Sequence, residues 1–411
     1  ILITCRTDAY AFFQDLSFGA ESALSSLNTM LTIIDALSNA GIVENQNNWP
    51  YQLIFAFFNG ESFDYIGSKR FVHDIQSFHC DQISDNACDL PHKYSLTFTN
   101  IQLEKIKLVI DLNQVGLRYN NASSVREIST HIYKQSNRAA QAFMSYMETH
   151  TDSSKLRITT PQRSVQIPPS SVMPFISAYQ VNNEPGAIVI TDHDDTTYLN
   201  PFYHSHLDDG HLDTQQMCAL AATLARTLYA MASGEHVQPT FMQSIFANCT
   251  LIQQINKCFL DSMNCPLFES FQLVEPRNDN TPPLPRINMY TSVFGWLKSV
   301  SLRTKFIHDF VADRMQNRTS QENSECQTNS DCPRFGSGQV CVKSICIESG
   351  TFFHDAVSPA FEYDQKKKQW LVVDESQPQW VESYWDKLYM RVYQKQPVLD
   401  TVAVFGLGLT L

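Results

Sequence analysis

Positive charge is scarce in this sequence. The 30 Lys and Arg residues are outnumbered by 42 Asp and Glu residues, so the 411-residue chain carries a formal net charge of −12. An acidic surface repels the phosphate backbone, and a nucleic-acid partner is therefore not expected. Charged residues of both signs make up only 18% of the chain, below the usual share of roughly a quarter, so little disorder is predicted.

The ends of the sequence lack familiar signals. No methionine and no signal peptide precede Ile1, and we expect a fragment that begins at a core strand. Residues 401–411 carry no charge but are too few to span a bilayer, which takes about 20 apolar residues. They are either a C-terminal core strand or, as we prefer, the beginning of a transmembrane helix, because the run stops without a cap or a turn.

The 11 cysteines favour disulfides over zinc. A structural zinc site usually contains a C-x2-4-C pair. The late cluster lacks that spacing, so we predict two disulfides of open pairing among Cys326, Cys332, Cys341 and Cys346. Cys80 and Cys88 are candidates for a further short loop. Cys5 lies in an apolar strand and is predicted to be a buried free thiol.

Three N-x-S/T sequons support a secretory route, together with the cysteine cluster. The candidate glycosylation sites are Asn121, Asn248 and Asn317.

The first 235 residues alternate apolar strands with amphipathic helices. Strands are predicted at 1–4, 52–58, 106–111 and 187–191, and helices after Gly19, over 63–75 and from Asp213 to Gly234. This pattern indicates an α/β sheet covered on both faces. Sites in such sheets form beyond the carboxyl ends of strands, which directs attention to residues 6–8, 59–64, 111–113 and 192–208.

Glu61 stands on a predicted strand-to-helix turn. A carboxylate there could act as a general base or could simply favour the positive end of a helix dipole. The residues themselves do not separate these two readings.

The surrounding segment, FFNGESFDYIGS at residues 57–68, resembles the F-F-x-G-E-[ST]-F-D-Y-I-G-S segment of the nicastrin family. Residues 12–13 (FF), 19–23 (GAESA) and 358–362 (SPAFE) resemble further motifs of that family. The resemblance covers most of the chain and is weaker through the linker and the cysteine cluster. It implies an aminopeptidase-like mixed sheet with helices on both faces, a disulfide-containing appendage and the start of a C-terminal transmembrane helix.

The resemblance also implies an organisation in five parts. These are an N-terminally truncated aminopeptidase-like domain (1–240), additional elements packing on it (241–325), a cysteine-rich segment (326–350), a membrane-proximal region (351–397) and the beginning of the membrane helix (398–411).

Nicastrins are similar to zinc aminopeptidases, whose ligand positions can be matched to this sequence. Asp8 and the base Glu61 are retained, and His204 matches the last histidine. The other positions hold Arg6, Ser22, Ser62 and Asn113. Zinc needs three or four N, O or S ligands, and Arg and Ser do not replace His and carboxylates. No metal, no cofactor and no hydrolytic activity are therefore expected. Residues 192–195 and 204–208 could bind a cation, but their spacing fits no specific site, and we interpret them as solvated loops.

By resemblance, the protein is a non-catalytic subunit of γ-secretase, with presenilin and two small multi-pass subunits as partners. It would be a single-pass type I membrane protein with a lumenal or extracellular ectodomain that admits short membrane-protein stubs. Either Glu61 and Tyr65 bind the substrate's amino terminus, or the domain is a steric gate in which Glu61 holds the fold, which we favour. The alternatives are an active aminopeptidase with a rearranged site, using Asp8, Glu61, His204 and the acidic loop, and a transferrin-receptor-like ectodomain that acts alone.

Overall fold

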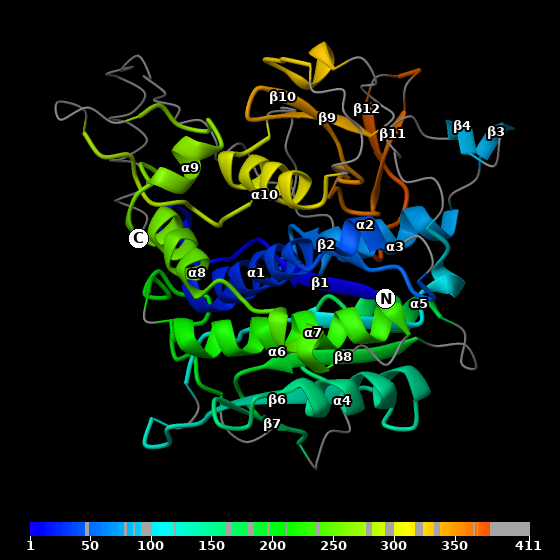
Figure 1. The fold of residues 1–411 in the computed structure, drawn as a ribbon. Helices are drawn as coiled ribbons and strands as arrows, with labels where there is room; N and C mark the ends of the chain where they lie inside the picture. The colour runs from blue at the N-terminus through cyan, green and yellow to red at the C-terminus, as the bar shows by residue number, and fades with distance from the viewer. Residues whose placement is uncertain are drawn as a thin grey trace, which may run out of the picture.

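A computed structural model provides the three-dimensional structure (Figure 1). It describes residues 1–45, 49–77, 80–84, 87–91, 101–118, 121–161, 167–179, 185–194, 198–210, 212–234, 239–276, 282–291, 300–316, 324–332, 338–354, 356–364, 366–367 and 369–378.

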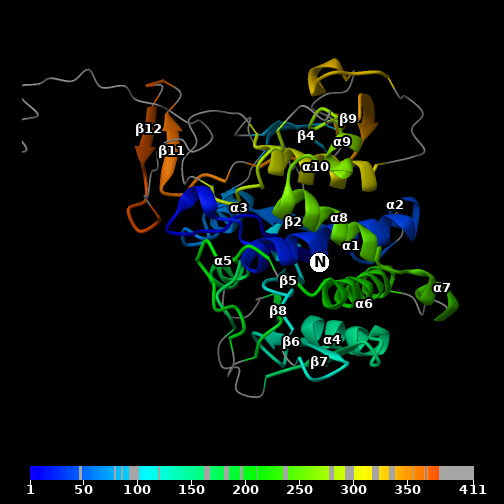
Figure 2. The same ribbon diagram turned by 90° about the vertical axis from the view of Figure 1, so that its left-hand side faces the viewer.

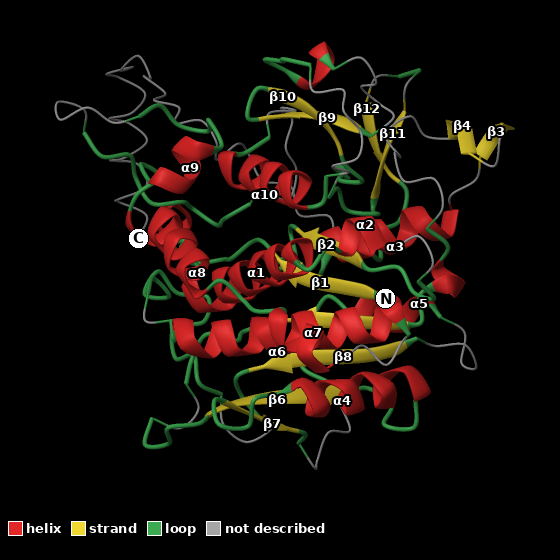
Figure 3. Cartoon of the chain, in the orientation of Figure 1, coloured by secondary structure: helices red, strands yellow, loops and turns green. Residues whose placement is uncertain are grey.

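A mixed sheet of six strands forms the centre of the molecule (Figures 1 and 3). Its order is β2 (Ile54–Phe58), β1 (Leu2–Arg6), β5 (Leu108–Leu112), β8 (Gly186–Thr191), β6 (Arg126–Ile132) and β7 (Leu156–Thr159). The first four are parallel, β6 runs antiparallel to β8, and β7 is parallel to β6. The four predicted strands are confirmed as β1, β2, β5 and β8.

Helices cover both faces of the sheet, as predicted. Figure 2 shows α1 (Ser25–Asn39), α4 (Arg138–His150) and α6 (Thr214–Ser233) on one side, and α3 (Ile66–Ser77) and α5 (Met173–Ala178) on the other. Successive residues of a strand point to opposite faces. Accordingly, Ile3 packs in the core beneath α1 and α6, whereas Leu2 packs in the core with Phe71 of α3 and Phe175 of α5.

The predicted helix boundaries follow from local chemistry. Asp213 caps α6 by accepting hydrogen bonds from two backbone amides of its first turn. Gly234 ends the same helix in the left-handed conformation with φ of 65°, which a glycine adopts without a steric cost. The helix predicted after Gly19 begins with a π-helical turn, Ala20–Leu24, which continues into α1.

Additional helices pack against α1. They are α8 (Cys249–Asn256), which continues into the π-helical turn Lys257–Asp261, and α10 (Leu302–Arg314). Phe259, Phe268, Phe306 and Phe310 form an aromatic cluster between them. The remaining elements are α2 (Ile42–Asn45), α7 (Pro239–Ser244), α9 (Pro266–Ser270), and three hairpins: β3 (Cys80–Ser84) with β4 (Ala87–Pro91), β9 (Gln339–Val342) with β10 (Ile345–Glu348), and β11 (Phe361–Asp364) with β12 (Gln369–Val372).

The cysteine cluster forms two disulfides, as predicted, and their pairing is Cys326–Cys341 and Cys332–Cys346. Two further disulfides, Cys218–Cys249 and Cys258–Cys265, join segments for which no bridge was predicted. Cys5 is a buried free thiol, which confirms that prediction. The side chains of Cys80 and Cys88 lie outside the described part of the structure.

The sequons differ in their surroundings. Asn121 lies exposed in a turn, and Asn248 is exposed at the first turn of α8, which its side chain caps. Asn317 lies outside the described residues, as does the predicted membrane helix of the tail. Among the described residues, no helix is long and apolar enough to cross a membrane. Glycosylation and the membrane helix both stay predictions.

Candidate functional site

The residues after the parallel strands meet at one edge of the sheet. Arg6 ends β1 and Asp8 follows it, while Glu61 follows β2. Asn113 follows β5, and Asp192 follows β8. These residues therefore lie at the strand ends to which the strand-end rule directs attention.

Asp8 accepts hydrogen bonds from the backbone at this edge of the sheet. Its two carboxylate oxygens accept the backbone N–H groups of Glu61 and Ser62, each at 2.9 Å. The side chain is fully buried, so these bonds tie the end of β1 to the turn after β2. Both oxygens of the carboxylate are thus already used.

Arg6 fills the space beside Asp8. A terminal nitrogen of its guanidinium donates to Ser62 Oγ and lies 3.6 Å from Asp8 Oδ2. Its other terminal nitrogen donates to the Tyr203 hydroxyl at 3.3 Å. A guanidinium is permanently charged, so this position repels a metal cation.

Glu61 is held from three directions. Its Oε1 accepts the backbone N–H of Ser68 at 2.9 Å, and its Oε2 accepts the hydroxyls of Ser68 at 2.8 Å and Ser171 at 2.7 Å. Only 5% of the residue is exposed. Burial raises the pKa of Glu61 to about 7, although the hydrogen bonds from Ser171 and Ser68 oppose the shift. Glu61 therefore connects the first turn of α3 to the loop before α5.

Asp111 is a second buried acid in the same pocket. The Thr4 hydroxyl donates to its Oδ1 at 2.6 Å, and Ser171 also hydrogen-bonds to it. Burial raises the pKa of Asp111 to about 6. Ser171 thus contacts both carboxyl groups. It lies in a loop without any periodic pattern, and no sequence signal indicates its role.

The turn that carries Tyr65 has an unusual backbone. Asp64 and Tyr65 are consecutive non-glycine residues in the left-handed region, with φ of 61° and 59°. Such residues are uncommon and need support from their surroundings. Asp64 pairs with Lys69 at 2.6 Å, and the Tyr65 amide donates to the Glu61 carbonyl at 3.2 Å. Burial raises the pKa of the half-buried Tyr65 to about 12.

The remaining matched positions do not form a ligand set. Ser22 is buried, and its backbone N–H donates to Asp208 Oδ2 at 3.0 Å. The Asn113 amide donates to the Pro169 carbonyl at 3.1 Å. His204 is exposed and stacks on Tyr203, with ring centroids 3.9 Å apart. Partial burial and the nearby Arg6 lower the pKa of His204.

The donor set does not fit a pair of zinc ions. A dinuclear site requires a bridging carboxylate and several further ligands. Here the Ser22 position offers no carboxylate, both Asp8 oxygens accept amides, and Arg6 brings a positive charge. In the described part of the chain, the only cluster of three His, Cys, Asp or Glu donors is Cys326, Cys332 and Cys346, which are bound in disulfides.

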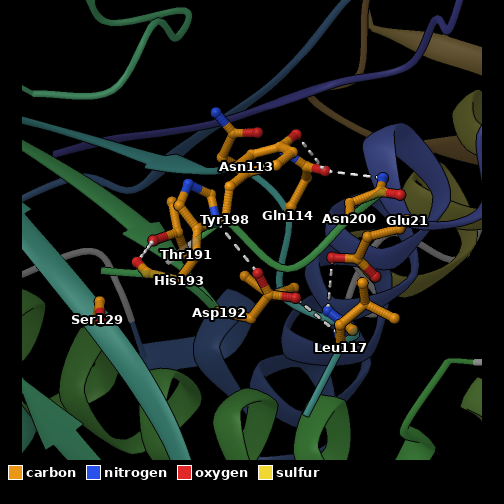
Figure 4. A network of polar contacts seen from close by, with 12 residues as sticks. Glu21, Asn113, Gln114, Leu117, Ser129, Thr191, Asp192, His193, Tyr198 and Asn200 are labelled. Carbon is orange, nitrogen blue, oxygen red and sulfur yellow. Dashed lines mark hydrogen bonds and ion pairs between the residues drawn. The ribbon is translucent and has the colours of Figure 1, made fainter. Parts of the chain in front are cut away.

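The interpretation of residues 192–195 and 204–208 as solvated loops was wrong for three side chains. Asp192, His193 and Asp208 are buried. Figure 4 shows Asp192 and His193 in a polar network with Glu21, Gln114 and other residues near the ends of β5 and β8. Burial here depends on distant parts of the chain, namely the turn before α1 and the loop after β5, which a local pattern of charges does not reveal.

These contacts describe a class of protein: a mixed α/β domain in which the positions matched to aminopeptidase ligands hold a guanidinium, hydroxyls and carboxylates that already accept hydrogen bonds. The family model for the nicastrin large lobe matches residues 1–233, more than half of the sequence. The chain belongs to the nicastrin family.

Curated relatives agree with this assignment. Nicastrin of Dictyostelium discoideum is 29% identical over 96% of this chain and 59% of its own length, and human nicastrin is 25% identical over 100% and 57%. A crystal structure of the γ-secretase component nicastrin superimposes with a TM-score of 0.74 at 26% identity, over 94% of this chain and 64% of the other. The predicted mixed sheet with helices on both faces and the disulfide-containing appendage are thereby confirmed, whereas the start of a transmembrane helix stays a prediction. The chain spans less than two thirds of the length of these relatives.

Proposed function

We propose that this chain is a non-catalytic part of a γ-secretase complex, in which it supports assembly and restricts which membrane-protein stubs gain access. Family membership supports the association with γ-secretase. Its partners would be presenilin and two small multi-pass subunits, and its substrates type I membrane-protein stubs. It would reside as a single-pass protein with its folded part in the lumen or outside the cell.

The hydrogen bonds and the burial of Glu61 are the main support for a non-catalytic role. A general base must reach a water, and an amine-binding carboxylate must reach a substrate. Three protein donors occupy the Glu61 oxygens, and almost none of the residue is exposed. A free ammonium group would have to displace these donors and lose its own hydration. The contacts favour a gate in which Glu61 maintains the local fold over direct recognition by Glu61 and Tyr65.

The two alternative functions find less support. An aminopeptidase with a rearranged site would need His204 to share a ligand with Asp8 and Glu61, but the His204 ring stacks on Tyr203 and meets Tyr10 edge to face. A transferrin-receptor-like ectodomain that acts alone would not explain the family membership.

The test measures binding to presenilin and binding to stub substrates separately. Tagged protein and its Glu61→Gln variant are expressed in cells, and presenilin and stub substrates are measured after affinity capture in mild detergent. Loss of presenilin capture at least as great as loss of substrate capture is expected. Exposed Glu104 provides the matched control, Glu104→Gln, which should change neither. Full assembly with selective loss of substrates bearing a free amino terminus would contradict the gate.

A further inference from the structure

Glu21, the glutamate of the GAESA motif, is not part of the hydrogen-bonded group of residues around Glu61. It lies in the π-helical turn before α1, and only 1% of it is exposed. Its Oε1 accepts the Gly116 N–H at 3.0 Å. The next amide of the loop after β5, that of Leu117, donates to Asp192 Oδ2 at 2.7 Å. Two consecutive amides therefore hold the two carboxyl groups side by side (Figure 4).

The second oxygen of Glu21 has no donor. Among the described residues, no N–H or O–H group donates to Oε2, although the atom is buried. The Gly116 backbone lies close to the same oxygen, since a Cβ added at that position would lie 2.5 Å from Oε2. Glu21 and Asp192 are within hydrogen-bonding reach of each other. A buried carboxylate oxygen without a donor is costly, and a proton shared with Asp192 would satisfy it.

The other polar groups around the pair do not supply this hydrogen. Asp208, which also faces Glu21, accepts the backbone N–H groups of Glu21 and Ser22 with its two oxygens and adds negative charge. Next to Asp192, His193 Nδ1 lies 3.2 Å from Asp192 Oδ1, and the His131 and Tyr198 rings lie beside His193. The Leu117 amide and the His193 ring already occupy the two oxygens of Asp192, so the shared proton is assigned to Glu21, whose Oε2 has no other partner among the described residues.

We propose that Glu21 and Asp192 share one proton and act as a pH-sensitive latch that fastens the loop after β5 to the turn before α1 and to the end of β8. The Ser25 hydroxyl supports the same loop by accepting the Val115 N–H at 3.2 Å. With the proton in place, the pair joins three segments of chain. Without it, two adjacent buried carboxylates repel each other and the loop loosens.

The direction of the pH effect follows from burial. Burial and the neighbouring Asp192 raise the pKa of Glu21 well above its usual value. A raised pKa in the folded state gives a stabilisation that is present at low pH and is lost as the pH rises through that pKa. The latch is therefore closed in acidic compartments and weakened in alkaline solution.

The test compares wild-type protein with Glu21→Gln and Asp192→Asn between about pH 5 and about pH 9. In each variant an amide can donate to the remaining carboxylate at every pH. Hydrogen exchange of residues 114–118, corrected for intrinsic rates, should accelerate in the wild type by about tenfold for each pH unit between the ordinary carboxyl range and the raised pKa of Glu21, and should level off above that pKa. Both variants should lose this acceleration. Asp213→Asn is the control, because the Asp213 carboxylate is paired with Arg126 and not with another carboxyl group. This variant should retain the acceleration.

Two results would overturn the latch. Unchanged acceleration in both variants would show that the pair does not hold the proton. If Ca²⁺ at alkaline pH restored protection in the wild type but not in Glu21→Gln, the pair would be a cation site instead. Failure of one variant to fold leaves the other as an independent test.

Discussion

The Ser171 hydroxyl donates to Glu61 Oε2 at 2.7 Å and also hydrogen-bonds to Asp111. This one side chain therefore connects two buried acids from neighbouring strand ends. The Ser171 hydrogen bonds favour the ionised form of Asp111 and oppose the effect of burial on the pKa of that carboxyl group. The two buried acids are thus satisfied by groups of the protein itself.

Removing the Ser171 hydroxyl should destabilise the protein. Ser171→Ala leaves Glu61 with one fewer donor in a buried site, and hydrogen bonds to charged groups contribute about 1.5–3 kcal/mol. We expect a loss of that size in the free energy of unfolding, measured by urea denaturation. Ser154→Ala removes an exposed hydroxyl that donates to Asp152 and should cost far less. Equal effects of the two substitutions would contradict a structural role for Ser171.

The free energy of unfolding should depend on pH through Glu61. Burial raises the pKa of Glu61 from its ordinary 4.5 to about 7. Because the folded-state value is the higher one, the stabilisation is complete below pH 4.5 and is lost as the pH rises through 7. Glu61→Gln should remove this part of the pH dependence of unfolding, whereas Glu104→Gln should keep it. A wild-type profile retained by Glu61→Gln would argue against the raised pKa.

The sequence predicts strands that are continuously apolar better than strands that mix polar and apolar residues. Continuous apolar runs such as residues 52–58 and 187–191 identified the buried parallel strands. By contrast, β6 (REISTHI) and β7 (LRIT) carry polar residues among the apolar ones and were not predicted. β7 is the edge strand of the sheet and β6 lies between it and β8, so this end of the sheet departs from the parallel, continuously apolar strands of the other end.

The candidate site was predictable in position but not in contacts. Asp8 and Glu61 could be located because they follow strands and match a family motif. Ser171, which lies 110 residues from Glu61, comes near it only through the fold. Disulfide connectivity likewise cannot be deduced from spacing, and the Cys218–Cys249 bridge spans 31 residues.

The two disulfides of the cysteine-rich segment should be important for stability. Cys326→Ser and Cys346→Ser each break one bridge, and loss of a native disulfide typically costs about 2–5 kcal/mol. Thermal unfolding should show a lower midpoint for both variants. Cys5→Ala changes a buried free thiol and serves as the control for loss of a cysteine without loss of a bridge. An unchanged midpoint in the two Ser variants would count against these pairings.

Asn248 should carry a glycan when the protein passes through the secretory pathway. Its side-chain oxygen accepts the amides of Thr250 and Leu251, which leaves the side-chain nitrogen available for attachment at an exposed helix end. Treatment with an amidase that removes N-glycans should decrease the mass of wild-type protein by one glycan more than that of Asn248→Gln. Asn121→Gln gives the same comparison for the other described sequon. Identical mass changes for wild type and Asn248→Gln would exclude modification at Asn248.

The absence of peptidase chemistry is tested most directly by metal analysis of the purified protein, combined with hydrolysis of aminoacyl-naphthylamides with and without a chelator. Because Arg6 occupies a ligand position and the Asp8 oxygens accept backbone amides, we expect neither stoichiometric zinc nor chelator-sensitive turnover. Two zinc ions per chain together with turnover that a chelator abolishes would contradict the account.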